Sequence, residues 1–257
     1  MTKSSPLSEK THTVNPYLAT PFHPLSILVI GAGGNGSRMV SKLAQIHSAL
    51  KMLDHPGLNV TLIDDDVVEK HNVGRQMFSK ADVGKPKSVV CIERINRFFG
   101  TNWNGYYSRI NDASDLLNNI IITCVDNNAC RKIVHDFFKG MKPNHGTRNH
   151  ESMPLYWLDM GNGKDRGQFN LSTPAGIKGR LKSLIDMYGY KKDDPNDNQP
   201  TCSAEESLQK QDLFVNDLLT TYVSNFLWTI LKKHCVIKYQ GMFLNFDTNI
   251  HSEIPIK

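Results

Sequence analysis

A run of apolar residues that ends in a cluster of glycines does most to limit what this chain can fold into. Residues 27–36 read Ile-Leu-Val-Ile-Gly-Ala-Gly-Gly-Asn-Gly, with glycines at Gly31, Gly33, Gly34 and Gly36. The apolar residues predict a buried strand, and the glycines predict a tight turn into a helix. Free N–H groups at such a helix start can bind phosphates, so the run predicts a Rossmann-like nucleotide site. The alternative is a turn that only packs a strand on a helix.

The residues after the glycines favour a triphosphate over a dinucleotide. The predicted second strand ends at Asp64, and Asp66 follows two residues later. Both are candidate nucleotide ligands, although Asp66 could equally be a solvated turn residue. Asn72 and Arg75 follow, and then Lys87. An arginine fork and a lysine ammonium suit a polyanion, and neither has an evident use against a hydride donor. A plain dehydrogenase is therefore disfavoured.

A third apolar run also ends in a carboxylate. Residues 120–127 read Ile-Ile-Ile-Thr-Cys-Val-Asp-Asn, which predicts a strand followed by Asp126 and Asn127. Ligands of open α/β sheets bind at such strand ends, so Asp126 is a candidate magnesium ligand. The alternative is that Asp126 caps the helix that we expect to begin near residue 128.

These motifs together resemble the ThiF/MoeB superfamily of ubiquitin-activating-type enzymes, which adenylate the C-terminal glycine of a ubiquitin-like or sulfur-carrier protein. The matching pieces are Gly-Ala-Gly-Gly-Asn-Gly, Asp-x-Asp, Asn-x-x-Arg-Gln, Gly-x-Pro-Lys and Val-Asp-Asn, in the right order over residues 27–130. Within the superfamily the chain is most similar to bacterial ThiF proteins of PRTRC-type and related ubiquitin-like operons. The resemblance implies an adenylation fold, with ATP and Mg²⁺ bound at the strand ends.

The resemblance also implies a role for each matching residue. Gly34 would lie against the phosphates and Asp64 would hold the ribose. Asn72 and Arg75 would grip the triphosphate, and Lys87 would neutralise charge on the α-phosphate. The expected nucleotide surface is Gly31, Gly33, Gly34, Gly36, Asp64, Asp66, Asn72, Arg75, Lys87, Asp126 and Asn127, with Asp126 binding magnesium.

Length and composition predict one domain. The chain has 257 residues, of which 39% are hydrophobic, enough for one large α/β core. We expect an N-terminal arm (1–25), a nucleotide-binding half (26–150) and a partner-binding half (151–257) with a mobile loop at 174–200. Without a bilayer-length apolar run or a signal peptide, a cytoplasmic location without membrane association is expected. The net charge of +5 comes from scattered basic residues, so no nucleic-acid partner is expected.

The cysteines predict neither disulfides nor zinc. The five cysteines form an odd set in an apparently cytosolic chain, and Cys91 and Cys124 lie in apolar patterns typical of a core. Many ThiF and MoeB relatives hold a structural zinc with two Cys-x-x-Cys pairs. This chain has no such pair, so a zinc-free protein is expected.

Cys202 has a different setting, in a polar segment that ends at an expected capping box from Ser203 to Glu206. A position before a helix N-terminus favours a thiolate, although the nearby Glu205 and Glu206 oppose it. The segment 200–206 begins Pro-Thr-Cys-Ser and resembles the Pro-x-Cys-Thr segment of ubiquitin-activating enzymes, where the cysteine accepts the activated protein as a thioester. The resemblance therefore implies that Cys202, Arg75 and Lys87 are catalytic. The alternative is an ordinary loop cysteine.

Periodicity predicts a doubly wound parallel half with an antiparallel C-terminal extension. Helices are expected at 36–53, 86–99, 128–140 and 204–232, and parallel strands at 27–31, 59–64 and 119–125. Short strands are expected at 156–160, 167–172, 236–239 and 242–246, with the last two joined in a hairpin by Gln240-Gly241.

Three functions remain open at this stage. The first is a two-step activating enzyme that adenylates a ubiquitin-like protein and then forms a thioester on Cys202, with a conjugating enzyme as a further partner. The second is a sulfur-carrier adenylyltransferase without a cysteine step, and the third is a silent scaffold. A gene for a ubiquitin-like protein or a conjugating enzyme next to the gene for this protein would indicate a ubiquitin-like conjugation pathway, such as one used in phage defence. The resemblance also implies a homodimer, because relatives commonly borrow an arginine from the N-terminal segment of the neighbouring subunit. Residues 1–37 here contain Lys3 and Lys10 but no arginine, so either a lysine substitutes or the dimer is arranged differently.

Overall fold

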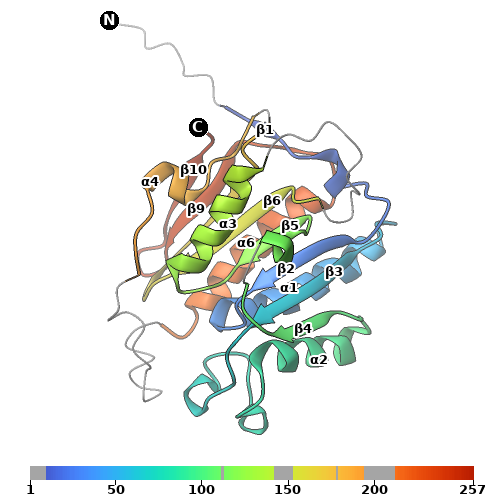
Figure 1. The fold of residues 1–257 in the computed structure, drawn as a ribbon, viewed down its shortest axis with the longest axis vertical. Helices are drawn as coiled ribbons and strands as arrows, with labels where there is room; N and C mark the ends of the chain where they lie inside the picture. Colours follow the sequence, from blue (N-terminus) through green and yellow to red (C-terminus); the bar gives the residue numbers. More distant parts are fainter. Residues whose placement is uncertain (1–9, 111–112, 142–152, 178, 194–211) are drawn as a thin grey trace, which may run out of the picture.

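The computed structural model describes residues 10–110, 113–141, 153–177, 179–193 and 212–257, drawn in colour in Figure 1. An eight-stranded mixed sheet forms its centre. Across the sheet the strands are β10 (Ile250–Pro255), β9 (Tyr239–Asn245), β7 (Arg166–Ser172), β6 (Tyr156–Asn162), β5 (Ile120–Thr123), β2 (Leu25–Ile30), β3 (Leu58–Asp64) and β4 (Asn104–Tyr107). The helices are α1 (Gly34–Lys51), α2 (Lys87–Phe99), α3 (Asn128–Gly140), α4 (Leu184–Tyr188) and α6 (Val215–Leu231).

The sheet is parallel in one half and antiparallel in the other, as the sequence predicts. Strands β4, β3, β2, β5 and β6 run parallel, and β6, β7, β9 and β10 pair antiparallel. The carboxyl ends of the parallel strands therefore meet at one edge, which we call the carboxyl edge. Helices α1, α2 and α3 each begin just beyond it, so their N-termini face that edge.

Two layers of helices cover the sheet because its central strands are apolar on both faces. Ile27 and Val29 of β2 belong to a core with α1, α2 and α6, while Leu28 and Ile30 belong to a second core that includes Val134 of α3. This alternation follows from the two-residue period of a strand. Figure 1 shows α3 on one side of the sheet and α1 and α6 on the other.

The last long helix starts later than the sequence predicts. Residues 212–214 are not helical, and α6 begins at Val215, whose N–H lies 3.4 Å from the Asp212 carbonyl. The expected stretch 204–232 is thus not one helix, and its first residues, 204–211, lie outside the described residues. The expected loop at 174–200 contains α4, which Ser183 caps through a capping box with Asp186. That Ser-x-x-Asp pattern is a helix signal that periodicity alone did not reveal.

The predicted hairpin at Gln240-Gly241 is wrong, because both residues lie inside β9. The Gln240 side chain is fully buried and donates to Asn170 Oδ1 and to the Lys182 carbonyl. A Cβ at Gly241 would lie 2.1 Å from the Phe169 carbonyl oxygen, so this glycine serves close strand packing rather than a turn. Strand β9 instead forms a hairpin with β10, which the sequence analysis missed along with β4.

The N-terminal arm is anchored to the far half of the chain. Strand β1 (His12–Thr13) pairs antiparallel with β8 (Val236–Ile237). His12 Nε2 lies 2.9 Å from the Tyr156 hydroxyl, and burial lowers the pKa of His12. In the described ranges no helix is long and apolar enough to cross a membrane.

Candidate functional site

The glycine run forms a tight turn in which most positions leave no room for a side chain. Gly31 has φ of +95° and follows β2, and Gly33 precedes the first residue of α1. A Cβ on Gly36 would lie 1.7 Å from the Gly31 carbonyl oxygen, so this position requires glycine. A Cβ on Gly34 would lie 2.4 Å from the Asn216 side chain of α6, whereas a Cβ on Gly33 would meet nothing within 4 Å. The turn is therefore packed against its neighbours at Gly34 and Gly36 and leaves free space beside Gly33, where a phosphate could approach the main chain.

Asp64 at the end of β3 is tied to this turn. Its Oδ2 accepts a hydrogen bond from the Ala32 N–H at 2.6 Å, and its Oδ1 accepts one from the Asp66 N–H at 2.9 Å. Burial raises the pKa of the Asp64 carboxyl, and the two backbone hydrogen bonds oppose that shift. The carboxylate thus joins the ends of two adjacent strands at the carboxyl edge.

Lys87 and Asp66 form an ion pair at the same edge. Lys87 is the first residue of α2, is 7% exposed, and places Nζ 2.7 Å from Asp66 Oδ2. Its main-chain N–H also donates to the Asp66 carbonyl at 3.0 Å. Asp66 is well exposed and the Lys87 side chain is buried, so the ion pair joins a buried cation to an exposed carboxylate.

Asn72 folds the turn that carries Arg75. Asn72 is 2% exposed, and its Oδ1 accepts the Glu69 N–H at 2.8 Å in a capping box around the short helix η2 (Lys70–Asn72). Its main-chain carbonyl accepts the Gln76 N–H at 2.9 Å. Arg75 is partly buried, and burial together with the nearby positive charge of Arg38 lowers its pKa.

Arg38 is a residue of this region that the sequence analysis missed. It lies in α1, and its guanidinium reaches Gly34, Arg75 and Asp217. Arginine one turn into a helix usually indicates an exposed surface, so nothing local marked it.

Asn127, not Asp126, caps α3, which corrects the alternative considered for Asp126. The Asn127 side chain accepts the Cys130 N–H at 2.8 Å. Asp126 is exposed at the end of β5. A structural capping role therefore belongs to Asn127, and the exposed Asp126 carboxylate is available to a ligand at the carboxyl edge.

A buried polar network that the sequence analysis did not single out supports this corner. Arg131 of α3 donates to Asp159 Oδ1 of β6 at 2.9 Å and to the Val125 carbonyl at 2.6 Å. Thr123 donates to the same Asp159 oxygen at 2.6 Å. The negative charge of Asp159 raises the pKa of Arg131 against the effect of burial. The network fixes the strand end that carries Asp126.

A segment running along α3 ends at the carboxyl edge. Ser183 contacts His135 in the middle of α3, and the Asp193 carboxylate accepts the Asn128 and Ala129 N–H groups at 2.5 and 3.0 Å. This carboxylate satisfies free amides at the helix N-terminus. The chain leaves the described part after Asp193 and returns at Asp212, whose N–H donates to the Lys164 carbonyl just beyond the end of β6.

Cys202 itself lies outside the described residues. The four other cysteines are free thiols, and burial raises the pKa of all of them. The pKa reaches about 12 at Cys91 and Cys124 and about 11 at Cys130. For Cys235, the next candidate nucleophile, burial outweighs the opposing charge of Lys233, so its neighbours do not make it a thiolate.

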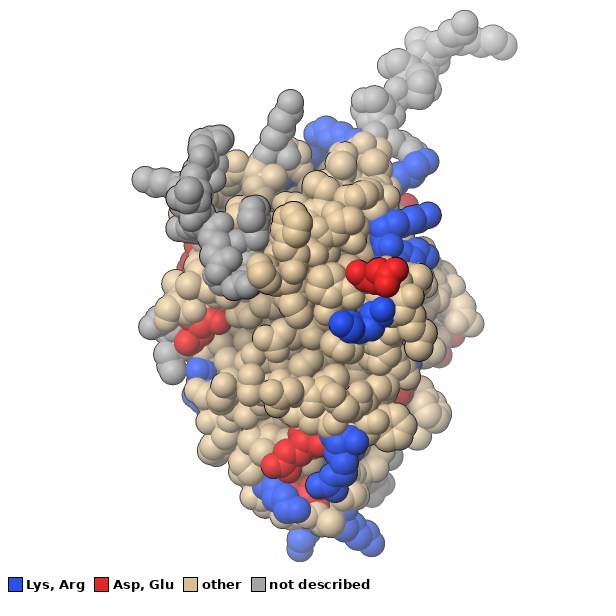
Figure 2. All heavy atoms as spheres, turned by 90° about the vertical axis from the view of Figure 1, so that its right-hand side faces the viewer, with Lys and Arg blue, Asp and Glu red and all other residues tan. Residues whose placement is uncertain are grey.

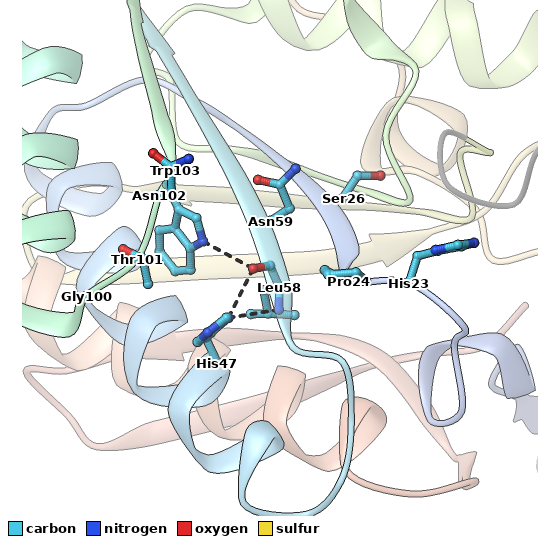
Figure 3. A pocket seen from close by; sticks show the side chains of 10 residues that line it. All are labelled: His23, Pro24, Ser26, His47, Leu58, Asn59, Gly100, Thr101, Asn102 and Trp103. Carbon is cyan, nitrogen blue, oxygen red and sulfur yellow. Dashed lines mark hydrogen bonds between the residues drawn. The ribbon is translucent and has the colours of Figure 1, made fainter.

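A pocket of about 510 Å³ lies at the opposite edge of the sheet, where β2 and β3 begin (Figure 3). Uncharged side chains of His47, Asn59, Thr101 and Trp103 are among those that line it. The Trp103 indole donates to the Leu58 carbonyl at 3.1 Å. The residues that line this pocket include none of the glycine turn. The candidate site therefore does not include this pocket and is the carboxyl edge. Figure 2 shows one face of the molecule, on which acidic and basic side chains lie next to one another around a broad uncharged area.

Comparison with known proteins gives the family of this fold and site. The ThiF family model matches residues 22–248, and the chain therefore belongs to the ThiF family. A NEDD8-activating enzyme E1 catalytic subunit of Arabidopsis thaliana is 37% identical over 114 residues, which cover 42% of this chain and 23% of that protein. The adenylyltransferase and sulfurtransferase UBA4 of Yarrowia lipolytica is 28% identical over 115 residues, which cover 43% and 27%.

Solved structures share the fold. E. coli MccB with ATP superposes with a TM-score of 0.53 at 18% identity, covering 90% of this chain and 64% of that one. PaaA gives a TM-score of 0.56 at 16% identity with the same coverage. These neighbours confirm the ThiF/MoeB adenylation fold. The matched regions make up only about a quarter of the two curated relatives.

Proposed function

We propose that this protein is an ATP-dependent adenylyltransferase that activates the C-terminus of a ubiquitin-like protein and then forms a thioester on Cys202. The observation that carries the proposal is the assembly of the glycine turn, Asp64, Lys87 and Asp126 at one edge of the sheet. The names of the two curated relatives, a NEDD8-activating enzyme and an adenylyltransferase, support it.

Each group of residues at this edge would bind a different part of the nucleotide. The N–H groups of the glycine turn would hold phosphates, and Asp64 would accept from the ribose. Arg75 and Lys87 would neutralise the phosphate charge, so that Lys87 leaves Asp66 when the nucleotide arrives. The exposed Asp126 fits Mg²⁺, which typically takes one or two carboxylates together with phosphate oxygens, and the ion would supply charge neutralisation there.

In the first step the terminal carboxylate of the partner attacks the α-phosphorus of ATP. A bond forms between a carboxylate oxygen and phosphorus, the bond to the β-phosphate oxygen breaks, and pyrophosphate leaves. The chain contributes mainly by holding the reactants in line and by offsetting negative charge.

In the second step the Cys202 thiolate attacks the acyl carbon of the adenylate. The carbon–sulfur bond forms, the bond to the phosphate oxygen breaks, and AMP leaves. The described residues on either side of Cys202 support this step. Asp193 lies at the start of α3 and Asp212 lies beside the end of β6, so both contact the carboxyl edge. The second candidate is a sulfur-carrier adenylyltransferase without a cysteine step, and the name of UBA4, an adenylyltransferase and sulfurtransferase, supports the sulfur-carrier part of it.

The test uses the full chain with ATP, Mg²⁺ and a candidate ubiquitin-like protein in two assays. Partner-dependent ATP–pyrophosphate exchange reports adenylation, and a covalent adduct cleaved by thiols reports the thioester. We expect Cys202→Ala to keep exchange and to lose the adduct, while Cys235→Ala, the matched control, keeps both. Exchange without an adduct in the wild type would favour the second candidate, and no exchange with any candidate partner would contradict the proposal.

A further inference from the structure

Arg38 links three segments that lie far apart in the sequence. Its side chain is 10% exposed, with Nε 2.7 Å from Asp217 Oδ2 in α6. Nη1 donates to the Gly34 carbonyl and Nη2 to the Arg75 carbonyl, each at 3.1 Å. The guanidinium therefore joins the glycine turn, the loop that carries Arg75 and the first turn of α6.

Arg38 contacts the loop at the main chain of Arg75. The Arg75 carbonyl is held by a charged donor, and such hydrogen bonds are roughly twice as strong as neutral ones. The loop also makes main-chain hydrogen bonds of its own, among them the Gln76 N–H to the Asn72 carbonyl at 2.9 Å and the Gly74 N–H to the Phe78 carbonyl at 3.4 Å. Without Arg38 the loop would keep these bonds and lose the link that Arg38 makes between the Arg75 and Gly34 carbonyls.

Charge explains why Asp217 belongs to the same unit. Arg38 and Arg75 are like charges close enough that Arg38 lowers the pKa of Arg75. Asp217 offsets one of the two charges, and its place in the first turn of α6 favours a carboxylate. The Asn216 side chain beside it lies against Gly34, so the start of α6 and the glycine turn are packed together.

We propose that Arg38 and Asp217 are positioning residues for the nucleotide: they hold the Arg75 loop and the start of α6 on the glycine turn before ATP binds. Arg38 and Asp217 belong to the same chain as the residues that they position. Residues 1–37 of this chain contain no arginine, so Arg38 is its first. The inference rests on the proposed function, because it assigns these residues to the ATP site.

The test compares ATP binding and turnover in Arg38→Ala, Arg38→Lys and Asp217→Asn. Calorimetry with ATP and Mg²⁺ gives the Kd without turnover, and pyrophosphate exchange gives KM for ATP and for the partner protein separately. For Arg38→Ala we expect the Kd and KM for ATP to rise about tenfold or more, the scale of a lost charged hydrogen bond, with KM for the partner unchanged. Arg38→Lys should recover part of the loss, because an ammonium keeps the charge but not the fork. Asp217→Asn should give a smaller rise.

Lys42→Ala removes a cation one turn further along α1 and is the matched control, for which we expect wild-type values. Equal ATP constants in wild type and in a folded Arg38→Lys and Asp217→Asn would overturn the positioning role and leave the proposed function intact. A rise in both KM values in proportion would equally overturn it, because it would indicate general structural damage. Absence of ATP binding by the wild type would overturn the proposed function as well.

Discussion

Lys87 Nζ lies 2.7 Å from Asp66 Oδ2, and this pair joins the end of β3 to the first residue of α2. The lysine stem is buried while the aspartate is exposed, so the pair can open toward a ligand without unfolding either element. An ammonium with three donors can leave one carboxylate for a phosphate, which supplies a higher charge.

Replacement of Lys87 or Arg75 by alanine should slow partner-dependent pyrophosphate exchange on the order of a hundredfold or more, the scale of a lost transition-state charge partner. Asp66→Asn should have a much smaller effect, because it removes only the resting partner of Lys87. Exchange rates measured at saturating ATP separate the two cases. A loss of less than tenfold for both cation variants would mean that the phosphates lie elsewhere.

Asp126 and Asn127 should separate chemistry from stability. Asp126→Ala should abolish adenylation and leave the free energy of unfolding nearly unchanged, because the side chain is exposed. Asn127→Ala should lower the free energy of unfolding by about 1 kcal/mol, because it removes the helix cap. Urea unfolding and pyrophosphate exchange measure the two effects, and wild-type exchange in Asp126→Ala would sink the magnesium assignment.

Gly36→Ala should destabilise the protein by about 3 kcal/mol or more, because the new Cβ would overlap the Gly31 carbonyl oxygen. Gly140→Ala is the control, since a Cβ there meets nothing within 4 Å at the end of α3. The control should be neutral or stabilising by about 0.5 kcal/mol. Chemical unfolding of the two variants decides, and equal stabilities would contradict the close contact.

Stability should fall as the pH drops below 6.5, the ordinary pKa of histidine, because burial lowers the pKa of His55. His55 Nδ1 accepts the Gly57 N–H at 2.9 Å, so the proton sits on Nε2 beside the Leu18 carbonyl. The unfolded chain then binds more protons than the folded one, and acid favours unfolding. His12, His47 and His135 shift in the same direction. His55→Gln should therefore reduce the fall in melting temperature between about pH 7.5 and pH 5.5 without abolishing it.

Local patterns in the sequence predict the glycine turn and the strands β2, β3 and β5 of the parallel half, because their signals lie within a few residues of each other. The strand at 27–31 and the helix at 128–140 match β2 and α3 closely. Gln240 resembles a turn residue in the sequence because its partner, Asn170, is 70 residues away, and only this pairing makes a polar residue part of a buried strand.

Arg38 and Asp193 were missed for a related reason. Each binds main-chain groups of a distant segment, 37 residues away for Arg38 and 65 for Asp193. Main-chain acceptors and donors exist at every residue, so the sequence carries no mark of which one a side chain will find. Only the folded chain shows that such residues belong to the candidate site.

The hydrogen bonds of Asp64 set a limit on what its carboxylate can still accept. A carboxylate offers about four lone-pair positions, and the N–H groups of Ala32 and Asp66 occupy one on each oxygen. Two positions remain, as many as a ribose has vicinal hydroxyls. An asparagine would replace one of these oxygens by a donor, which would face an N–H group of the protein or a hydroxyl that needs an acceptor. The two free acceptor positions of Asp64 therefore match the two hydroxyls of a diol. A sugar with a single hydroxyl would leave one of these positions without a donor.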